Sequence, residues 1–394
     1  MCWLGSTSSH RIWNVSEYTT ATLKQHFDVH NSRFGRFGHS RRQSHRMPVS
    51  GRISGCIRVP AAIASSAMDT PAPEAADPQA LVAVELDPAN GALAKPISFD
   101  ARYGEGAGRT LVLGGGGVYF VAWQVAYLNG LIKRGVELEQ AEIIVGTSAG
   151  SVVASILSNR GLARFAKQVN WIAKVPALVG LLAPASDFYP SQIRAIDMFR
   201  AADNNRPETI QAIGHAALAA HTPTAAEMRR STGFAIAARG WSSPALQITT
   251  VDTYTGERLV VTQKSGVSSV RAAAASSAVP GIFSPQPIHD RWCMDGGVSG
   301  SGTHCDLVAG SGRALVISLG AALKQEVATM TIQPGNLTNE LTELHRTGTK
   351  AFARGPSKVD MARLMDPSAV PEAIALGDEQ AANDAVEMAA FWNS

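Results

Sequence analysis

The stretch RTLVLGGGGVYF, residues 109–120, decides the fold. Apolar or β-favouring residues lead into four consecutive glycines, and bulky apolar residues resume after them. Because glycine has no Cβ and weakens helices and strands alike, four in a row indicate that something must come close to bare backbone. The flanking residues predict a short buried strand at 110–113 and a buried helix at 118–134.

The residues that follow repeat this alternation. Residues 141–145 (AEIIV) predict a second strand, residues 146–150 a turn, and residues 151–157 a second helix. Strand, helix, strand and helix at this spacing imply an α/β fold in which crossover helices join parallel strands.

The rest of the chain adds helices first and then strands. Residues 158–240 are expected to be mainly helical, and residues 245–263 predict a hairpin whose turn is Thr255–Gly256. A small-residue helix should end at Pro280. Two further strands are expected in RWCMDGG and RALVISLG, and a helical C-terminal part from about Asn336.

Composition and charge exclude several function classes. The chain has 394 residues, is 45% apolar and carries a net charge of +3. Residues 1–68 hold nine Lys or Arg against two acidic residues, a net of +7, so the remainder is near −4 (3 − 7). A nucleic-acid partner is therefore not expected. Four cysteines without CxxC spacing favour free thiols over zinc or disulfides, so we expect no metal. We expect no cofactor either, because the chain has neither a complete dinucleotide fingerprint nor the Gly-Lys-Ser/Thr of a P-loop.

The sequence GTSAG, residues 146–150, fits the pattern G-x-S-x-G between a strand and a helix. A sharp turn there lifts the hydroxyl of Ser148 out of the sheet as a nucleophile, and the cramped turn needs small neighbours. Those neighbours are Gly146, Thr147, Ala149 and Gly150. The alternative is an ordinary turn in which Ser148, Thr147 or Ser151 caps the helix.

The glycines after the first strand suit the same chemistry. Attack of a serine on an ester creates an oxyanion, which preorganised backbone N–H groups at a helix N-terminus stabilise. The N–H groups expected to do this belong to Gly115, Gly116, Gly117 and Val118. The rival use is a dinucleotide site, but its G-x-G-x-x-G fingerprint fails at the third glycine.

The base that activates the serine has two candidates. An α/β-hydrolase has a histidine downstream of its serine and acid, and the best histidine here is His304 in SGTHCD. Asp295 in MDGG is more conspicuous, because it follows a short strand and precedes Gly296 and Gly297, which let a serine approach. Burial would raise the pKa of Asp295 and make it a better base. The alternative is that Asp295 only forms a turn.

Together these elements resemble the patatin-like phospholipase family, bacterial type. LVLGGGG, GTSAGS, AAAASSAVPGIFSP and MDGGV match its order and spacing over about residues 109–319. The resemblance implies a three-layer α/β/α fold around a mostly parallel sheet. It implies a Ser148–Asp295 dyad, an oxyanion hole in the glycine loop, and hydrolysis of carboxylic esters in phospholipids or other fatty-acyl lipids.

The sequence departs from the family pattern at one place. Tyr119 and Phe120 stand where the family loop has a basic or small residue and then a glycine. We expect these side chains to narrow the pocket. Two alternatives to a hydrolase therefore stay open: a non-catalytic lipid-binding or scaffold protein, and an acyltransferase that uses the same site.

The chain divides into three predicted parts. Residues 1–68 are expected to be a disordered basic extension, because they cannot bury enough apolar surface to order themselves. Residues 69–108 are expected to be a linker with one strand at 80–86, and residues 109–394 the patatin-like catalytic domain. With no secretory signal peptide visible, we expect a cytoplasmic protein with peripheral membrane contact. Residues 171–190 are either a lipid-contacting cap over the site or a cover of the core.

Overall fold

A computed structural model describes residues 91, 93–173, 188–238, 240–322 and 336–394. The chain divides into two units, Met1–Ala72 and Pro73–Ser394, and every described residue belongs to the second. The predicted basic extension, the predicted strand at 80–86 and most of the predicted cap lie outside the described residues.

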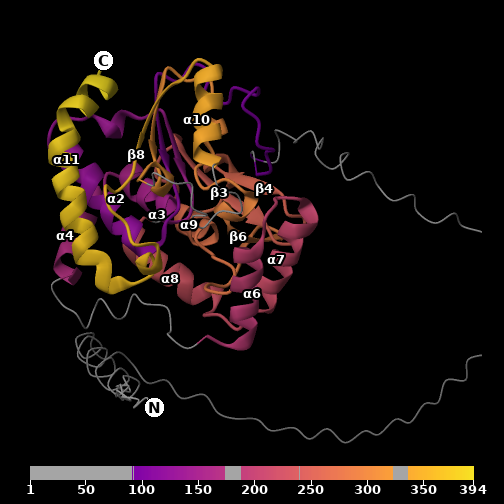
Figure 1. Ribbon diagram of the computed structural model, residues 1–394. Helices are drawn as coiled ribbons and strands as arrows, with labels where there is room; N and C mark the ends of the chain where they lie inside the picture. The colour runs from indigo at the N-terminus through magenta and orange to yellow at the C-terminus, as the bar shows by residue number, and fades with distance from the viewer. Residues whose placement is uncertain (1–90, 92, 174–187, 239, 323–335) are drawn as a thin grey trace, which may run out of the picture. The chain divides into compact units, whose positions relative to one another are not determined.

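A sheet of eight strands forms the centre of the second unit (Figure 1). The strand order is β5-β6-β3-β2-β1-β7-β8, and β4 pairs with β3. The five strands from β3 to β8 along this order are parallel, whereas β4, β6 and β5 add antiparallel pairs at one side. The strands are β1 (Arg109–Leu113), β2 (Ile143–Gly146), β3 (Leu246–Asp252), β4 (Arg258–Val261), β5 (Gln286–Ile288), β6 (Arg291–Asp295), β7 (Arg313–Ile317) and β8 (Lys350–Arg354).

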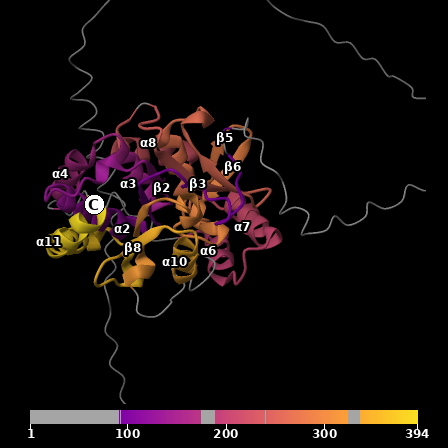
Figure 2. The same ribbon diagram turned by 90° about the horizontal axis from the view of Figure 1, so that it is seen from above.

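Helices cover both faces of the sheet. Figure 2 shows α2, α3, α4 and α11 on one side and α10 on the other. The helices are α2 (Gly117–Ile132), α3 (Ala149–Ser158), α4 (Leu162–Ala173), α6 (Pro190–Ala201), α7 (Pro207–Ala219), α8 (Ala225–Ile236), α9 (Ser269–Ser276), α10 (Asn336–Arg346) and α11 (Val370–Trp392). The short 3-10 helices that concern the site are η6 (Gly296–Ser299), η7 (Cys305–Val308) and η9 (Met361–Arg363).

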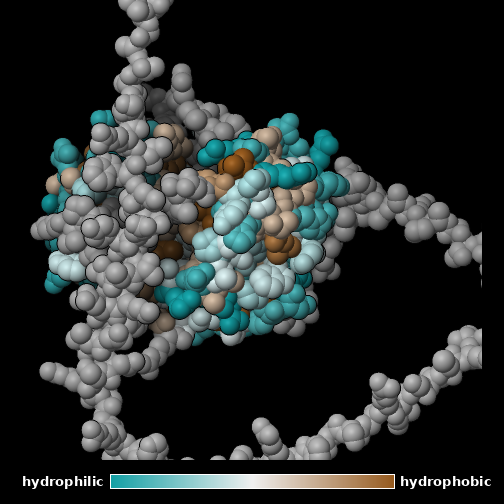
Figure 3. Space-filling model, turned by 90° about the horizontal axis from the view of Figure 1, so that it is seen from below, coloured by the Kyte–Doolittle hydropathy of each residue, from teal (hydrophilic) through white to brown (hydrophobic). Residues whose placement is uncertain are grey.

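One face of the second unit is mixed in hydropathy. Figure 3 shows brown apolar residues between teal hydrophilic ones on the face seen from below. No helix among the described residues has the length and apolarity that a membrane crossing requires.

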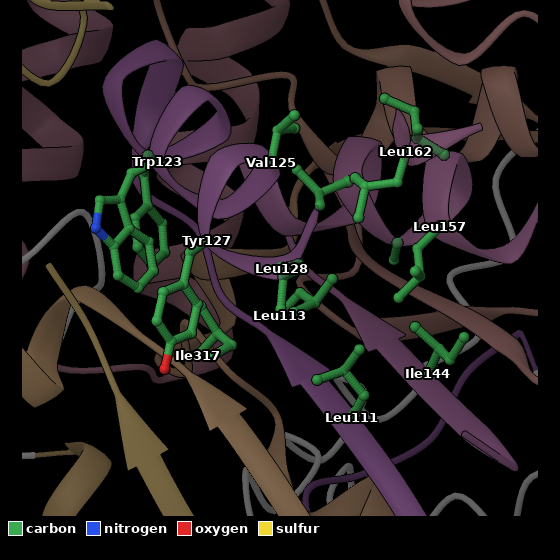
Figure 4. Packing of buried hydrophobic residues seen from close by; sticks show 14 of the residues in the cluster. Leu111, Leu113, Trp123, Val125, Tyr127, Leu128, Ile144, Leu157, Leu162 and Ile317 are labelled. Atoms are coloured by element: carbon green, nitrogen blue, oxygen red, sulfur yellow. The ribbon is translucent and has the colours of Figure 1, made fainter. Parts of the chain in front are cut away.

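Alternating side chains on the strands contribute to apolar clusters on both faces of the sheet. In β1, Leu111 and Leu113 pack into the larger core with the aromatic residues of α2 (Figure 4). Val112 belongs to a smaller core, to which Leu337, Leu341 and Leu344 of α10 also belong or pack. The side chains of β7 also alternate between the larger and the smaller core, because successive side chains of a strand point to opposite faces. Apolar clusters on both faces of one sheet give the three-layer α/β/α fold that the resemblance implies.

The structure confirms most predicted elements and corrects others. The predicted strands at 110–113 and 141–145, the hairpin and the two later strands are present, with helices between them. The small-residue helix ends at Ser276 and not at Pro280, and strand β5 is an addition to the predicted elements. The C-terminal part is not all helical, because β8 extends the sheet beside β7. Part of the predicted linker belongs to the folded domain, since Leu93 and Ala94 are buried and Ala94 bridges to Leu259 of β4.

Candidate active site

Strand register brings the predicted site residues to one edge of the sheet. Gly146, two residues before Ser148, pairs with Ile248 of β3, and Thr250, two residues after Ile248, pairs with Asp295 at the end of β6. On the other side of β2, Leu113 pairs with Gly146, which places the glycine loop at the same level. Ligands of open α/β sheets bind at this carboxyl edge.

Ser148 sits in a backbone conformation that side chains rarely adopt. Its φ is 51° and its ψ is −121°, and its side chain makes no hydrogen bond that caps α3. The capping alternative therefore does not hold for Ser148. Such strain persists only where the surroundings over-determine it, and it concentrates at functional sites. Ser148 is 8% exposed.

Both glycines of the serine turn, residues 146–150, are required, because neighbouring atoms lie too close to leave room for a side chain. A Cβ on Gly150 would lie 1.9 Å from the Leu113 carbonyl oxygen, and one on Gly146 would lie 2.6 Å from Ser151 Cα. Thr147 ties the turn to β3, since its hydroxyl shares a 2.8 Å hydrogen bond with that of Thr249. Ala149 is buried at the start of α3.

Hydroxyls from the end of α9 hold the strained serine. The N–H of Ser148 donates to Ser276 Oγ at 2.8 Å, and Ser277 Oγ donates to the Ser148 carbonyl oxygen at 3.1 Å. Ser151 Oγ donates to the same carbonyl at 2.6 Å. No local pattern around Ser276 and Ser277 predicts this role, because only the fold brings them to a residue over 120 positions away.

The two carboxylate oxygens of Asp295 have different surroundings. Oδ1 accepts the Gly297 N–H at 2.8 Å, so Asp295 does form the predicted turn. Oδ2 is buried and has no well-formed hydrogen bond with any described residue. Burial raises the pKa of Asp295 to about 7, although the nearby Ser148 hydroxyl and the Gly297 N–H both lower it. A buried, unsatisfied acceptor is costly for folding, so its retention points to function.

The glycine after Asp295 is needed for close packing. A Cβ on Gly296 would lie 2.6 Å from Thr249 Oγ1 and 2.7 Å from the Thr249 carbonyl oxygen. Thr249 therefore contacts both the serine turn and the loop that carries Asp295.

In the glycine loop, residues 114–117, one of the N–H groups predicted to stabilise the oxyanion already has a hydrogen-bond partner. The N–H of Gly115 donates to the Gly302 carbonyl oxygen at 3.2 Å, so it is not free for an oxyanion in this conformation. Gly115 instead lets the glycine loop lie close to the serine turn, because a Cβ there would lie 3.1 Å from Ser148 Cβ. Gly116 is the N-cap of α2, and the first-turn N–H groups of Gly117 and Val118 have no partner within the helix.

Tyr119 and Phe120 do not narrow the site as predicted. Both side chains are buried in the larger core. The Tyr119 hydroxyl donates to the Lys358 carbonyl oxygen at 3.1 Å, and Phe120 stacks on Trp123 with ring centroids 5.6 Å apart. The position after the glycine loop therefore accepts large residues because α2 directs them into the core.

His304, the other candidate base, has both ring nitrogens occupied by groups other than Ser148. Nδ1 lies 3.1 Å from Arg258 Nη1, and Nε2 lies 3.2 Å from the Gly296 carbonyl oxygen. Cys293 and Cys305 are free and buried, and burial raises the pKa of both thiols. The described residues contain no group of three or more His, Cys, Asp or Glu side chains arranged for a metal ion.

The fold and the site together define an α/β protein with a strained serine beside a buried carboxylate. Residues 111–304 match the family model described as Patatin-like phospholipase, and this part of the chain is a domain of that family. Members of this family are lipid hydrolases. The match includes the glycine loop, the serine turn and Asp295.

Two solved structures show distant similarity. VipD from Legionella pneumophila is 12% identical, with a TM-score of 0.31, and the match covers 69% of this chain and 66% of VipD. The type III effector protein ExoU is 15% identical, with a TM-score of 0.26, and the match covers 73% of this chain and 54% of ExoU. The chain thus spans less than two thirds of either protein. No curated protein matches the chain.

Proposed function

We propose that the protein is a serine-dependent lipid acyl hydrolase, with Ser148 as nucleophile and Asp295 as base. One observation carries the proposal: a serine at φ 51° stands beside a buried carboxylate whose Oδ2 has no well-formed hydrogen bond. A pKa of about 7 for Asp295 suits a group that must take and return a proton near neutral pH.

The proposed reaction passes through an acyl-enzyme. Asp295 Oδ2 takes the proton of Ser148 Oγ while Oγ bonds to the ester carbonyl carbon, and the proton then passes to the alcohol oxygen as its bond to carbon breaks. Water attacks the acyl-enzyme, Asp295 accepts a proton from that water, and the proton returns to Ser148 Oγ as the fatty acid leaves. The oxyanion would be stabilised by the N–H groups of Gly116, Gly117 and Val118.

An apolar cleft beside the site fits an acyl chain. Its volume is about 310 Å³, within the range of small-molecule sites, and most of its lining is apolar. The lining includes Ile196, Phe199, Val279, Pro280, Leu364 and Met365. The cleft adjoins the glycine loop, since a Cβ on Gly117 would lie 2.6 Å from the Leu364 carbonyl oxygen. On the other side, its lining residue Val279 follows Ala278, whose carbonyl oxygen accepts the Asp295 N–H.

Labelling of the serine tests the proposal directly. A fluorophosphonate should label wild type and the matched control Ser158→Ala, whose serine lies in α3, and should not label Ser148→Ala. Asp295→Asn should lower kcat about 10²- to 10⁴-fold on an ester panel of increasing chain length.

Two outcomes would favour the alternative functions. Vesicle binding without turnover of any ester, and without any effect of Ser148→Ala, would identify a lipid-binding protein. Transfer of the acyl group to an added alcohol in preference to water would identify an acyltransferase.

Contact with a lipid surface is part of the proposal. Among the described residues from α4 to α8, four large apolar or aromatic side chains are exposed: Trp171 (62%), Tyr189 (55%), Ile193 (47%) and Phe234 (68%). Aromatic residues of this kind favour the interface between membrane and water. A peripheral membrane location follows from this contact.

A further inference from the structure

His304 is a fully buried titratable group that the proposed reaction does not use. Its ring lies between Arg258 and the loop that follows Asp295. Because a guanidinium has only donors, Arg258 Nη1 must donate to His304 Nδ1. The proton of the neutral ring therefore resides on Nε2, which donates to the Gly296 carbonyl oxygen at 3.2 Å.

Arg258 is itself held firmly, so it fixes the orientation of the imidazole. Its two Nη atoms donate to the two oxygens of Asp306, each at 2.8 Å, and this ion pair is almost completely buried. Its other donors reach the carbonyl oxygens of Lys95 at 2.9 Å and Pro96 at 2.7 Å, as well as His304. All five donors of the guanidinium are thus occupied.

The loop that carries His304 contacts both sides of the site. The Gly302 carbonyl oxygen accepts the Gly115 N–H of the glycine loop, and His304 reaches Gly296, the neighbour of Asp295. The loop is anchored by Glu340 of α10, whose carboxylate accepts the hydroxyls of Ser301 and Thr303. His304 has a φ of 57°, so these contacts hold it in a conformation that side chains rarely adopt.

We propose that His304 is a positioning residue, whose Nε2–H fixes the Gly296 carbonyl and thereby holds Asp295 in place to accept the serine proton. This inference rests on the proposed function. Burial, and then the Arg258 charge, lower the pKa of His304 well below its ordinary value, so the ring stays neutral and keeps the required tautomer. A displacement of about 1 Å at a reacting group can cost about 100-fold in rate.

Two amide substitutions separate the two ends of the ring. His304→Gln places an amide near the Nε2 position and can still donate to Gly296, but it cannot act as a base. His304→Asn keeps a polar group near Nδ1, facing Arg258, and does not reach Gly296. We expect His304→Gln to retain kcat within about tenfold, and His304→Asn to lose about 100-fold in kcat with little change in KM.

A second measurement does not depend on turnover. Hydrogen–deuterium exchange of a peptide over residues 293–300 should quicken in His304→Asn and stay near wild type in His304→Gln. His345→Gln, at an exposed histidine of α10, is the matched control and should change neither kcat nor exchange.

Either of two results would overturn the inference. If both variants are as inactive as Ser148→Ala while exchange stays at the wild-type level, His304 acts as a proton carrier. If His304→Asn keeps wild-type kcat and exchange, the hydrogen bond to Gly296 does not position Asp295. Should wild type itself neither react with fluorophosphonate nor hydrolyse any ester, the proposed function fails, and the exchange comparison still decides the role of His304.

Discussion

Two residues at the site are in states that folding alone would not favour. Ser148 has a strained backbone. The Asp295 carboxyl is buried, and no charged group contributes to the shift of its pKa. Each state costs free energy, and each suits the reaction proposed here: the strain presents the hydroxyl, and the burial makes the carboxylate a better base.

The raised pKa of Asp295 sets the pH dependence of turnover. Only the ionised carboxylate can accept the serine proton, so kcat should rise with pH to a plateau, with its midpoint at about 7. At pH 6 it should be about a tenth of the plateau. Measurement of kcat on a soluble ester from pH 5 to 9 checks this, and a midpoint near 4 would contradict it. His304→Gln should leave the midpoint in place.

The same shift predicts that Asp295→Asn stabilises the fold. Because the folded-state pKa is about 7 and the unfolded value is about 3.9, the native state binds more protons between these values. Wild-type stability therefore falls as the pH rises through this window and is constant above it. Relative to wild type, Asp295→Asn should gain up to about 3 kcal/mol between pH 5 and pH 8.

Urea denaturation of both proteins at the two pH values measures this difference. An advantage of Asp295→Asn that is the same at pH 5 and pH 8 would mean that Asp295 is not buried as an unpaired acid. In that case Asp295→Asn would still lose activity, but its stability relative to wild type would not depend on pH.

At the scale of elements, glycines decide how closely helix and strand approach. A Cβ on Gly150 would lie 1.9 Å from the Leu113 carbonyl oxygen, and this backbone belongs to β1 in the middle of the sheet. Gly150→Ala should therefore force α3 away from β1, lower the stability by about 3 kcal/mol and reduce turnover. Thermal denaturation and ester hydrolysis measure both effects.

Gly240→Ala is the matched control, because a Cβ there meets nothing within 4 Å. Its stability should stay within about 0.5 kcal/mol of wild type. Equal stability of the two variants would show that α3 and β1 can separate without cost.

Elements with a local pattern could be predicted from the sequence, and those that depend on distant partners could not. Two such elements are the strand with its glycines at 109–117 and the serine turn at 146–150. Each is recognised from consecutive residues of the sequence. Strand β8 (Lys350–Arg354) was missed because it is short and only half-buried, and its pairing with β7 is non-local. The contacts of His304 were missed for the same reason, since Arg258 and Gly296 reach it only in the folded chain.

At the scale of the whole molecule, four of the eight exposed large apolar side chains of the described residues lie on α4, at the start of α6 or on α8. The end of α4, the start of α6 and helix α8 lie toward the lower side of the second unit (Figure 1), and Figure 3 shows apolar residues on the face seen from below. These elements carry Trp171, Tyr189, Ile193 and Phe234. These four side chains are the basis of the proposed lipid contact, because a contiguous exposed apolar patch marks a contact with a partner or a membrane.

Replacement of two of these residues tests the proposed lipid contact. Burial of a large apolar side chain contributes about 1.5–3 kcal/mol, so Phe234→Ser and Trp171→Ser should each weaken binding to phospholipid vesicles about tenfold or more. Turnover of a soluble short-chain ester should not change, because neither residue lies at the reacting groups. Val386→Ser is the matched control, since Val386 is 84% exposed but lies on α11. If the control weakens vesicle binding as much as Phe234→Ser does, the loss of binding is not specific to the α4–α8 side. That result would contradict the proposed lipid contact there.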